Sequence, residues 1–96
     1  MKLQVRDEIA RFHCPGCKGD HWVNIEDAWP IWTFNGDTEK PTLHPSVVVT
    51  YNGEDADQEG CQPSRCHSWV RDGQIEFLSD CTHALAGQTV ALPDVG

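Results

Sequence analysis

The sequence predicts a small, mostly β, single-domain protein whose antiparallel strands surround a metal site of the zinc-knuckle or zinc-ribbon type. Short segments in which apolar and polar residues alternate are separated by turn residues, and no stretch has the sustained 3.6-residue period of a long amphipathic helix. Cys14 and Cys17 flank a Pro-Gly turn. Because a chain of 96 residues can bury only a modest core, we expect one domain over residues 1–96 that a bound metal stabilises.

The expected strands are bounded by turn signals. Asp7-Glu8, Asn35-Gly36, Asn52-Gly53 and Asp72-Gly73 each follow a segment rich in β-branched, aromatic or alternating residues. A short helical turn ending at Gly87 is expected before the last strand. In chain order, the segments expected to be strands are 3–5, 9–12, 21–25, 29–34, 47–51, 69–70, 75–78 and 89–92.

The Asp72-Gly73 pair predicts a hairpin whose register matters for the metal site. A two-residue turn at this pair places Val70 opposite Ile75. Counting back along both strands puts Cys66 and Cys81 on one face as diagonal neighbours, about 7–8 Å apart at their backbones. The hairpin can therefore present two thiols at its open end.

Four cysteines form the predicted zinc site. Cys14 and Cys17 supply one pair from a tight turn, and Cys66 and Cys81 supply the second pair, which gives the four ligands of a closed tetrahedral zinc. Imidazole is an equally good ligand, so His67 and His83 stand as alternates to the second pair. The fifth cysteine, Cys61, follows an acidic loop at 54–60 and is expected to be a free thiol, and that loop lacks the spacing of an EF-hand.

The residues around the second pair leave a catalytic reading open. On the predicted register His67 points away from the cysteines, toward the same face as Asp80. A zinc with four protein ligands is structural, whereas a zinc with an open position could activate water with Asp80 as the base. The cytidine-deaminase signature is not met, because the chain has no H-x-E and Pro15 lies inside the CxxC.

Charge and hydropathy narrow the class of partner and the location. The formal net charge of -8 opposes broad binding to nucleic acid, which requires Lys and Arg to neutralise phosphates, and it suits a protein partner. No apolar run approaches the length of a membrane span, and the first residues lack a signal-peptide core. We therefore expect a cytoplasmic location. In that reducing compartment, closely spaced cysteines are expected to bind a metal rather than to form a disulfide.

Several longer motifs are spread over most of the chain: FHCPGC at 12–17 with His21 following, WTFNGD at 32–37, PTLHPSVVV at 41–49, CHSWVRDGQIEFLSDCTH at 66–83 and LAGQTVALP at 85–93. Together they resemble one family of small phage and prophage proteins of unknown function, whose members often bear the label ammonia monooxygenase. That label implies a copper-dependent membrane oxidase, and we reject it because the chain has no apolar span and no copper site. The resemblance implies a phage or prophage origin and a small zinc-binding β fold in a bacterial host cell, and it supplies no reaction.

Together these observations favour a zinc-binding accessory module without catalytic residues. Its expected partner is a host or phage protein, and its role would include modulation of a host defence. The alternative is a small zinc-dependent hydrolase that uses Asp80 and the nearby histidines. The sequence does not indicate an oligomeric state.

Overall fold

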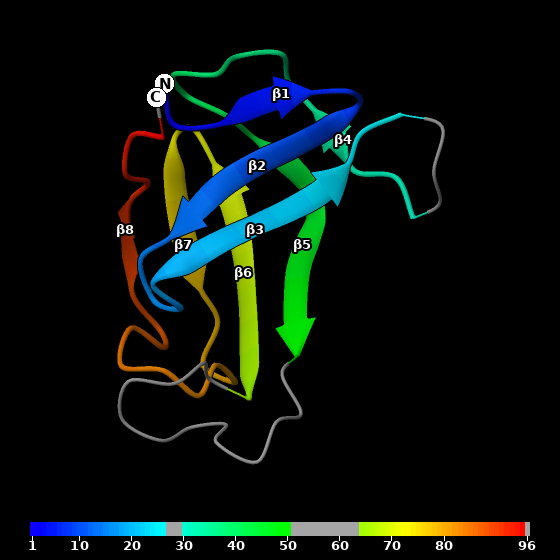
Figure 1. Ribbon diagram of the computed structural model, residues 1–96. Coiled ribbons are helices and arrows are strands. Elements are labelled where there is room, and N and C mark those ends of the chain that lie inside the picture. The colour runs from blue at the N-terminus through cyan, green and yellow to red at the C-terminus, as the bar shows by residue number, and fades with distance from the viewer. Residues whose placement is uncertain (27–29, 51–63, 96) are drawn as a thin grey trace.

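The computed structural model describes residues 1–26, 30–50 and 64–95, which form two antiparallel β-sheets (Figure 1). No helix occurs among these residues, so the predicted mostly β, antiparallel class is confirmed. The part of the chain that is described also contains no helix long and apolar enough to cross a bilayer.

The N-terminal sheet consists of three consecutive strands in the order β1-β2-β3. The β1–β2 turn is formed by Asp7 and Glu8, both with positive φ (51° and 70°), as a tight two-residue hairpin requires. Along β2 the buried side chains alternate with more exposed ones, which directs one face of this sheet into the core. The strands are β1 (Gln4–Arg6), β2 (Ile9–Cys14) and β3 (Gly19–Asn24).

The second sheet has five strands in the order β4-β5-β6-β7-β8. Its central hairpin has the predicted register, with Val70 opposite Ile75 and Ser68 opposite Phe77. Asp72 and Gly73 form the turn with φ of 49° and 79°, a conformation that glycine adopts at little cost. The strands are β4 (Thr33–Phe34), β5 (Leu43–Thr50), β6 (Arg65–Arg71), β7 (Gln74–Phe77) and β8 (Thr89–Ala91).

The core lies between the two sheets. Figure 1 shows the three-stranded sheet crossing obliquely over one face of the five-stranded sheet. Phe12 from β2 and Phe77 from β7 are almost completely buried, as are Leu3, Leu43 and Leu92. The two ends of the described chain lie side by side, joined by a hydrogen bond from the Val95 N–H to the Met1 carbonyl (2.8 Å).

Several expected segments differ from the observed ones. Of the described residues 30–34, only Thr33 and Phe34 form a strand, and the strand expected at 47–51 begins earlier, at Leu43. It continues through a cis His44–Pro45 peptide, and its register with β6 shifts between Leu43 and Val47. The residues 84–87 form turns rather than a helix. Trp29, the Asn52-Gly53 turn, the acidic loop and Cys61 lie outside the described residues.

The most consequential difference is at the end of β7. This strand ends at Phe77, so the ladder with β6 stops at the pair Ser68–Phe77. A turn follows, in which the Cys81 N–H donates to the Leu78 carbonyl (3.2 Å). The continued strand from which the diagonal placement of Cys66 and Cys81 was predicted is therefore not observed.

Candidate functional site

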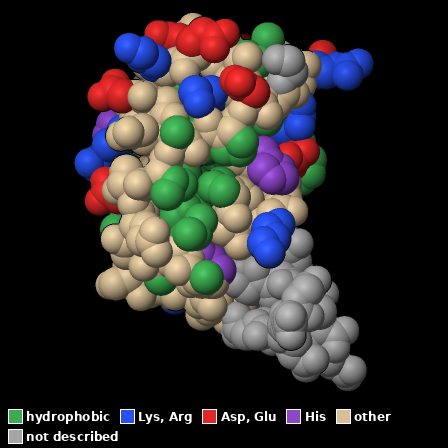
Figure 2. All heavy atoms as spheres, turned by 90° about the vertical axis from the view of Figure 1, so that its left-hand side faces the viewer, with side chains coloured by type: hydrophobic (Ala, Val, Ile, Leu, Met, Phe, Trp, Pro, Cys, Tyr) green, Lys and Arg blue, Asp and Glu red, His purple; other side chains and the backbone are tan. Residues whose placement is uncertain are grey.

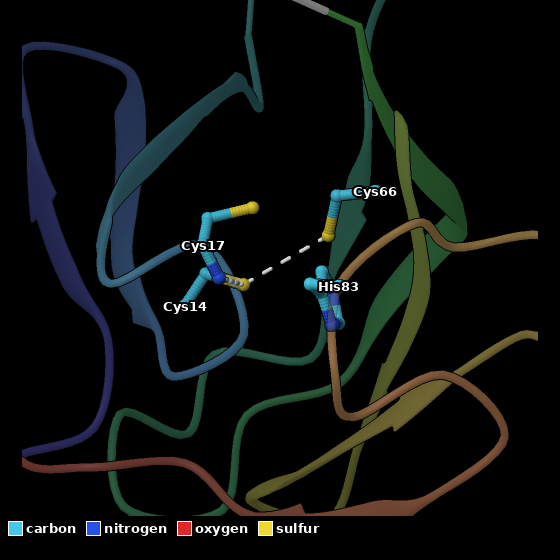
Figure 3. Close-up of side chains that lie close together, drawn as sticks. All are labelled: Cys14, Cys17, Cys66 and His83. Carbon is cyan, nitrogen blue, oxygen red and sulfur yellow. Dashed lines mark hydrogen bonds between the residues drawn. The ribbon is translucent and has the colours of Figure 1, made fainter. Parts of the chain in front are cut away.

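Three thiols and one imidazole gather between the two sheets. Cys14, Cys17, Cys66 and His83 each offer one ligand atom, and these atoms all lie within 4.8 Å of one another. Figure 3 shows that they converge from three separate segments: the end of β2 and its turn, β6, and the segment before β8. The three cysteines are buried, so the cluster could hold a metal ion away from bulk water.

The CxxC turn is shaped as a metal-binding knuckle. The Cys17 N–H donates to the Cys14 Sγ (3.3 Å), and the Lys18 N–H donates to the Cys14 carbonyl (2.8 Å). Gly16 is required here because a Cβ at this position would overlap the imidazole ring of His83. The absence of a side chain at Gly16 therefore allows the CxxC turn to pack directly against the ring of His83.

The electrostatics of the three thiols favour a bound cation. Hydrogen bonds from Cys17 and Cys66 lower the pKa of Cys14, while the bond to Cys14 raises the pKa of Cys17 to about 12. The hydrogen bond to Cys14 likewise raises the pKa of Cys66, and burial adds to the shift. Three thiols this close cannot all ionise unless a positive charge joins them, and a metal dication supplies that charge.

His83 fits the same site. Burial lowers the pKa of His83 and thereby favours the neutral imidazole, which is the form that binds metals. Its ring packs edge-on against Phe77 (4.5 Å between centroids), and the Leu85 N–H approaches Nδ1 at 3.2 Å. Among the described residues Nε2 is buried without a hydrogen-bond partner. A buried imidazole nitrogen beside three thiols is suited to ligation.

Three of the four predicted ligands are thus brought together, with the alternate His83 in the fourth place. Cys81 and His67 are not members of the cluster. The Cys81 Sγ instead accepts from the His67 N–H (3.2 Å) and donates to the His67 carbonyl (3.1 Å). Because β7 ends early, Cys81 contacts the backbone of β6 rather than extending the sheet. The identity of the ligands stays a prediction.

A second constellation lies on the other face of β6. The Ser46 hydroxyl is 2.9 Å from His67 Nε2, and His67 Nδ1 is 3.2 Å from Asp80 Oδ2. A carboxylate only accepts hydrogen bonds, so Nδ1 carries the proton and Nε2 accepts from the serine. Ser, His and Asp in this order of contact have the geometry of a nucleophile, its base and the group that orients the base.

This constellation is accessible to solvent. The side chain of His67 is 22% exposed and that of Asp80 is 43% exposed, while Ser46 is half-buried. The hydrogen bond from His67 lowers the pKa of Asp80, and the Arg65 guanidinium, with Nε 3.0 Å from the same oxygen, contributes further. Asp80 is therefore ionised at neutral pH and available to orient the imidazole.

The segment 78–82 holds Asp80 in place along β6. The Leu78 N–H donates to the His67 carbonyl (2.9 Å), and the Thr82 N–H donates to the Arg65 carbonyl (3.0 Å). These bonds, together with the Cys81 thiol, replace the strand partner that β6 loses where β7 ends. The thiol–imidazole cluster and the Ser46–His67–Asp80 constellation therefore share two segments of the chain: Cys66 is followed directly by His67 in β6, and Asp80 lies three residues before His83.

Sequence reasoning placed His67 and Asp80 on one face but missed Ser46. The signal for Ser46 is the pairing of β5 with β6, in which Val48 lies opposite His67. Ser46 and Val48 are two residues apart and share the outer face. Nothing local marks that pairing, because β5 and β6 are separated by residues 51–64.

Comparison with known proteins gives one match. The family model described as "BubE: Bacterial ubiquitination-like system serine protease" matches residues 1–78. This range includes Ser46 and His67, and it ends two residues before Asp80. Searches of the curated proteins and of the solved structures returned no match.

The match corrects the function expected from the sequence. A phage-type zinc-binding accessory module and its alternative, a zinc hydrolase that uses Asp80 as base, are both wrong in the light of a serine-protease family. The matching description names a bacterial system and names neither phage nor zinc. The motifs visible in the sequence are the cysteine-rich segments, whereas Ser46 lies on a strand that contains no cysteine.

Proposed function

The chain belongs to the BubE family of bacterial ubiquitination-like system serine proteases, and from this premise we propose that Ser46, His67 and Asp80 are its catalytic triad. The observation that carries the proposal is the continuous chain of two hydrogen bonds from the Ser46 hydroxyl through the imidazole to the Asp80 carboxylate. We infer that the substrate is a polypeptide of the ubiquitination-like system that the family description names.

The roles follow from the geometry. Ser46 Oγ attacks the scissile carbonyl while His67 Nε2 accepts the hydroxyl proton, and the same nitrogen then returns that proton to the departing amine. Water hydrolyses the resulting ester in a second round that uses His67 in the same way. Asp80 keeps the proton on Nδ1 and stabilises the imidazolium that forms at each step.

We further propose that the metal of the thiol cluster is Zn²⁺ and that its role is structural. Three thiolates and one imidazole are a common donor set of closed zinc sites, and the cluster lies on the face of β6 opposite the triad. Cys14, Cys17, Cys66 and His83 would hold the ion. Its contribution to catalysis would be to fix the segments that position His67 and Asp80.

The direct test of the triad is covalent labelling of the purified 96-residue chain with a fluorophosphonate. This small probe reacts with activated serine hydroxyls, so mass spectrometry should find the adduct on Ser46. We expect Ser46→Ala and His67→Ala to reduce the labelling rate by about 10³-fold or more. Ser79→Ala removes an exposed hydroxyl from the same region and should label like the wild type.

Two results would contradict the proposed triad. One is an adduct on a serine other than Ser46, and the other is a Ser46→Ala chain that labels at the wild-type rate. Circular dichroism of each variant shows whether a lost adduct reflects lost chemistry or lost folding.

A further inference from the structure

β5 carries the proposed nucleophile and has one unpaired edge. Among the described residues β4 pairs only with Leu43 and His44, and β5 is followed on its other side by β6. In Figure 1 the lower half of β5 accordingly forms the right-hand margin of the five-stranded sheet. The stretch from Val47 to Thr50 is thus paired with a described strand on one side only.

The hydrogen bonds of His67 show which groups face this edge. The His67 N–H donates to Cys81 Sγ, and its carbonyl accepts from the Leu78 N–H, so both groups point away from β5. Val48 lies opposite His67, and the two therefore form a non-hydrogen-bonded pair of the antiparallel ladder. The N–H and carbonyl of Val48 then point away from β6, toward the open edge.

The pair at the end of β5 has the same arrangement. Arg65 lies opposite Thr50. The Arg65 N–H donates to the Thr82 hydroxyl (3.1 Å), and its carbonyl accepts from the Thr82 N–H (3.0 Å). The backbone groups of Thr50 therefore face the open edge too. The N–H and carbonyl groups of Val48 and Thr50 together offer two donors and two acceptors, spaced as a further antiparallel strand would need them.

We infer that an extended segment of the substrate polypeptide binds along this edge of β5, paired through its backbone with Val48 and Thr50. The inference rests on the proposed function, because the edge leads directly to the Ser46 hydroxyl. An added strand places alternate substrate side chains over the outer face of the sheet, where Val48 is 47% exposed. Backbone pairing supplies affinity for any extended chain, and the exposed apolar side chain favours an apolar residue beside it.

Val48→Pro tests the edge without removing a bond between β5 and β6. The Val48 N–H is not used in that ladder, and proline is tolerated in a strand where the N–H faces outward. Val48→Thr is the matched control, because it keeps the N–H and the β-branched shape. Each variant is compared with the wild type in cleavage of a mixed-sequence peptide library and in fluorophosphonate labelling.

We expect Val48→Pro to lower the cleavage rate by about tenfold or more, and to label with fluorophosphonate at the wild-type rate, because the small probe does not need the edge. Val48→Thr keeps the N–H and should therefore cleave clearly faster than Val48→Pro. Cleavage by Val48→Pro at the wild-type rate would overturn the inference. A second result would also overturn it: in gel filtration the wild type elutes as a dimer and Val48→Pro as a monomer, while peptide cleavage is unchanged. The edge would then pair two copies of this chain rather than a substrate.

A backbone scan of the substrate provides an independent test. The best-cleaved library peptide is resynthesised with single N-methyl amides, which remove one donor at a time. Because N–H groups of a strand point alternately to its two sides, methylation should slow cleavage by about tenfold at every second residue and leave the residues between them unaffected. A uniform effect along the peptide would contradict strand pairing.

Failure of this inference is distinguishable from failure of the proposed function. A chain that does not label on Ser46 contradicts the triad. A chain that labels on Ser46 and cleaves peptides equally well with and without the Val48→Pro substitution contradicts the edge and leaves the triad in place.

Discussion

At the scale of single residues, Asp80 is the member of the proposed triad whose environment decides how much it contributes to catalysis. Its carboxylate receives one hydrogen bond from His67 and an ion pair from Arg65, and nearly half of its side chain is exposed. Water can therefore partly replace it, unlike the buried carboxylate of larger serine proteases.

Asp80→Asn should slow fluorophosphonate labelling by about 10²- to 10⁴-fold, because an amide no longer fixes the tautomer of His67. Arg65→Gln, which removes the ion pair and keeps the carboxylate, should have a much smaller effect. Pseudo-first-order labelling rates measured at a fixed pH compare the two variants. Equal losses in both would show that Asp80 acts only as a structural partner of Arg65.

The sequence allowed part of the site to be predicted at this scale. Cys14 and Cys17 could be paired because their spacing is local, and His67 could be separated from Cys66 because adjacent residues of a strand face opposite ways. The choice between Cys81 and His83 could not be made, since it depends on where β7 ends. Ser46 could not be found, because its partner lies on a different strand.

At the scale of elements, the segment 78–82 takes over the role of a strand next to β6. It supplies backbone donors at Leu78 and Thr82, and between them the Cys81 thiol bonds to both backbone groups of His67. The hairpin register could be predicted from Asp72-Gly73. The Cys81 thiol, which bonds to the β6 backbone where a strand would otherwise pair, could not, because such a contact leaves no periodic pattern in the sequence.

We predict that Cys81→Ala keeps the metal content of the wild type and lowers the labelling rate about tenfold, because His67 loses two backbone contacts. Cys81→Ser should restore much of the rate, since a hydroxyl can make both bonds. Metal content is measured by elemental analysis and Ser46 reactivity with the fluorophosphonate. Loss of metal from Cys81→Ala would return Cys81 to the ligand set that the sequence predicted.

At the scale of the whole molecule, the core is small and two sheets must be held together. The thiol–imidazole cluster joins them, because Cys14 ends β2 and Cys17 lies in the β2–β3 turn of the first sheet, whereas Cys66 belongs to β6 of the second. The face shown in Figure 2 has acidic and basic side chains interspersed around a small apolar area, with no extended basic patch. That a protein is the partner stays a prediction.

Removal of the metal by a strong chelator should lower the melting temperature by at least about 10 °C, because binding free energy is folding free energy in a site of this kind. Differential scanning calorimetry with and without chelator measures the shift. Ser46→Ala should show the same shift as the wild type. Cobalt in place of zinc should leave the labelling rate unchanged, and a rate that follows the identity of the metal would contradict a purely structural role.

The outline of the fold was predictable because alternating segments and turn pairs are local signals. The division into two sheets was not, since it depends on pairings between distant strands. The spacing of Cys14 and Cys17 predicted a cysteine cluster, while only the family match pointed to serine chemistry.

The adjacency of Cys66 and His67 in β6 has a consequence for how this chain can evolve. One residue faces the metal cluster and its neighbour faces the triad, so a single inserted or deleted residue upstream in this strand would exchange them. The thiol would then be presented to the substrate and the imidazole to the metal, and both sites would fail together. We therefore expect length changes in functional variants to be confined to the connections, with β6 admitting substitutions only.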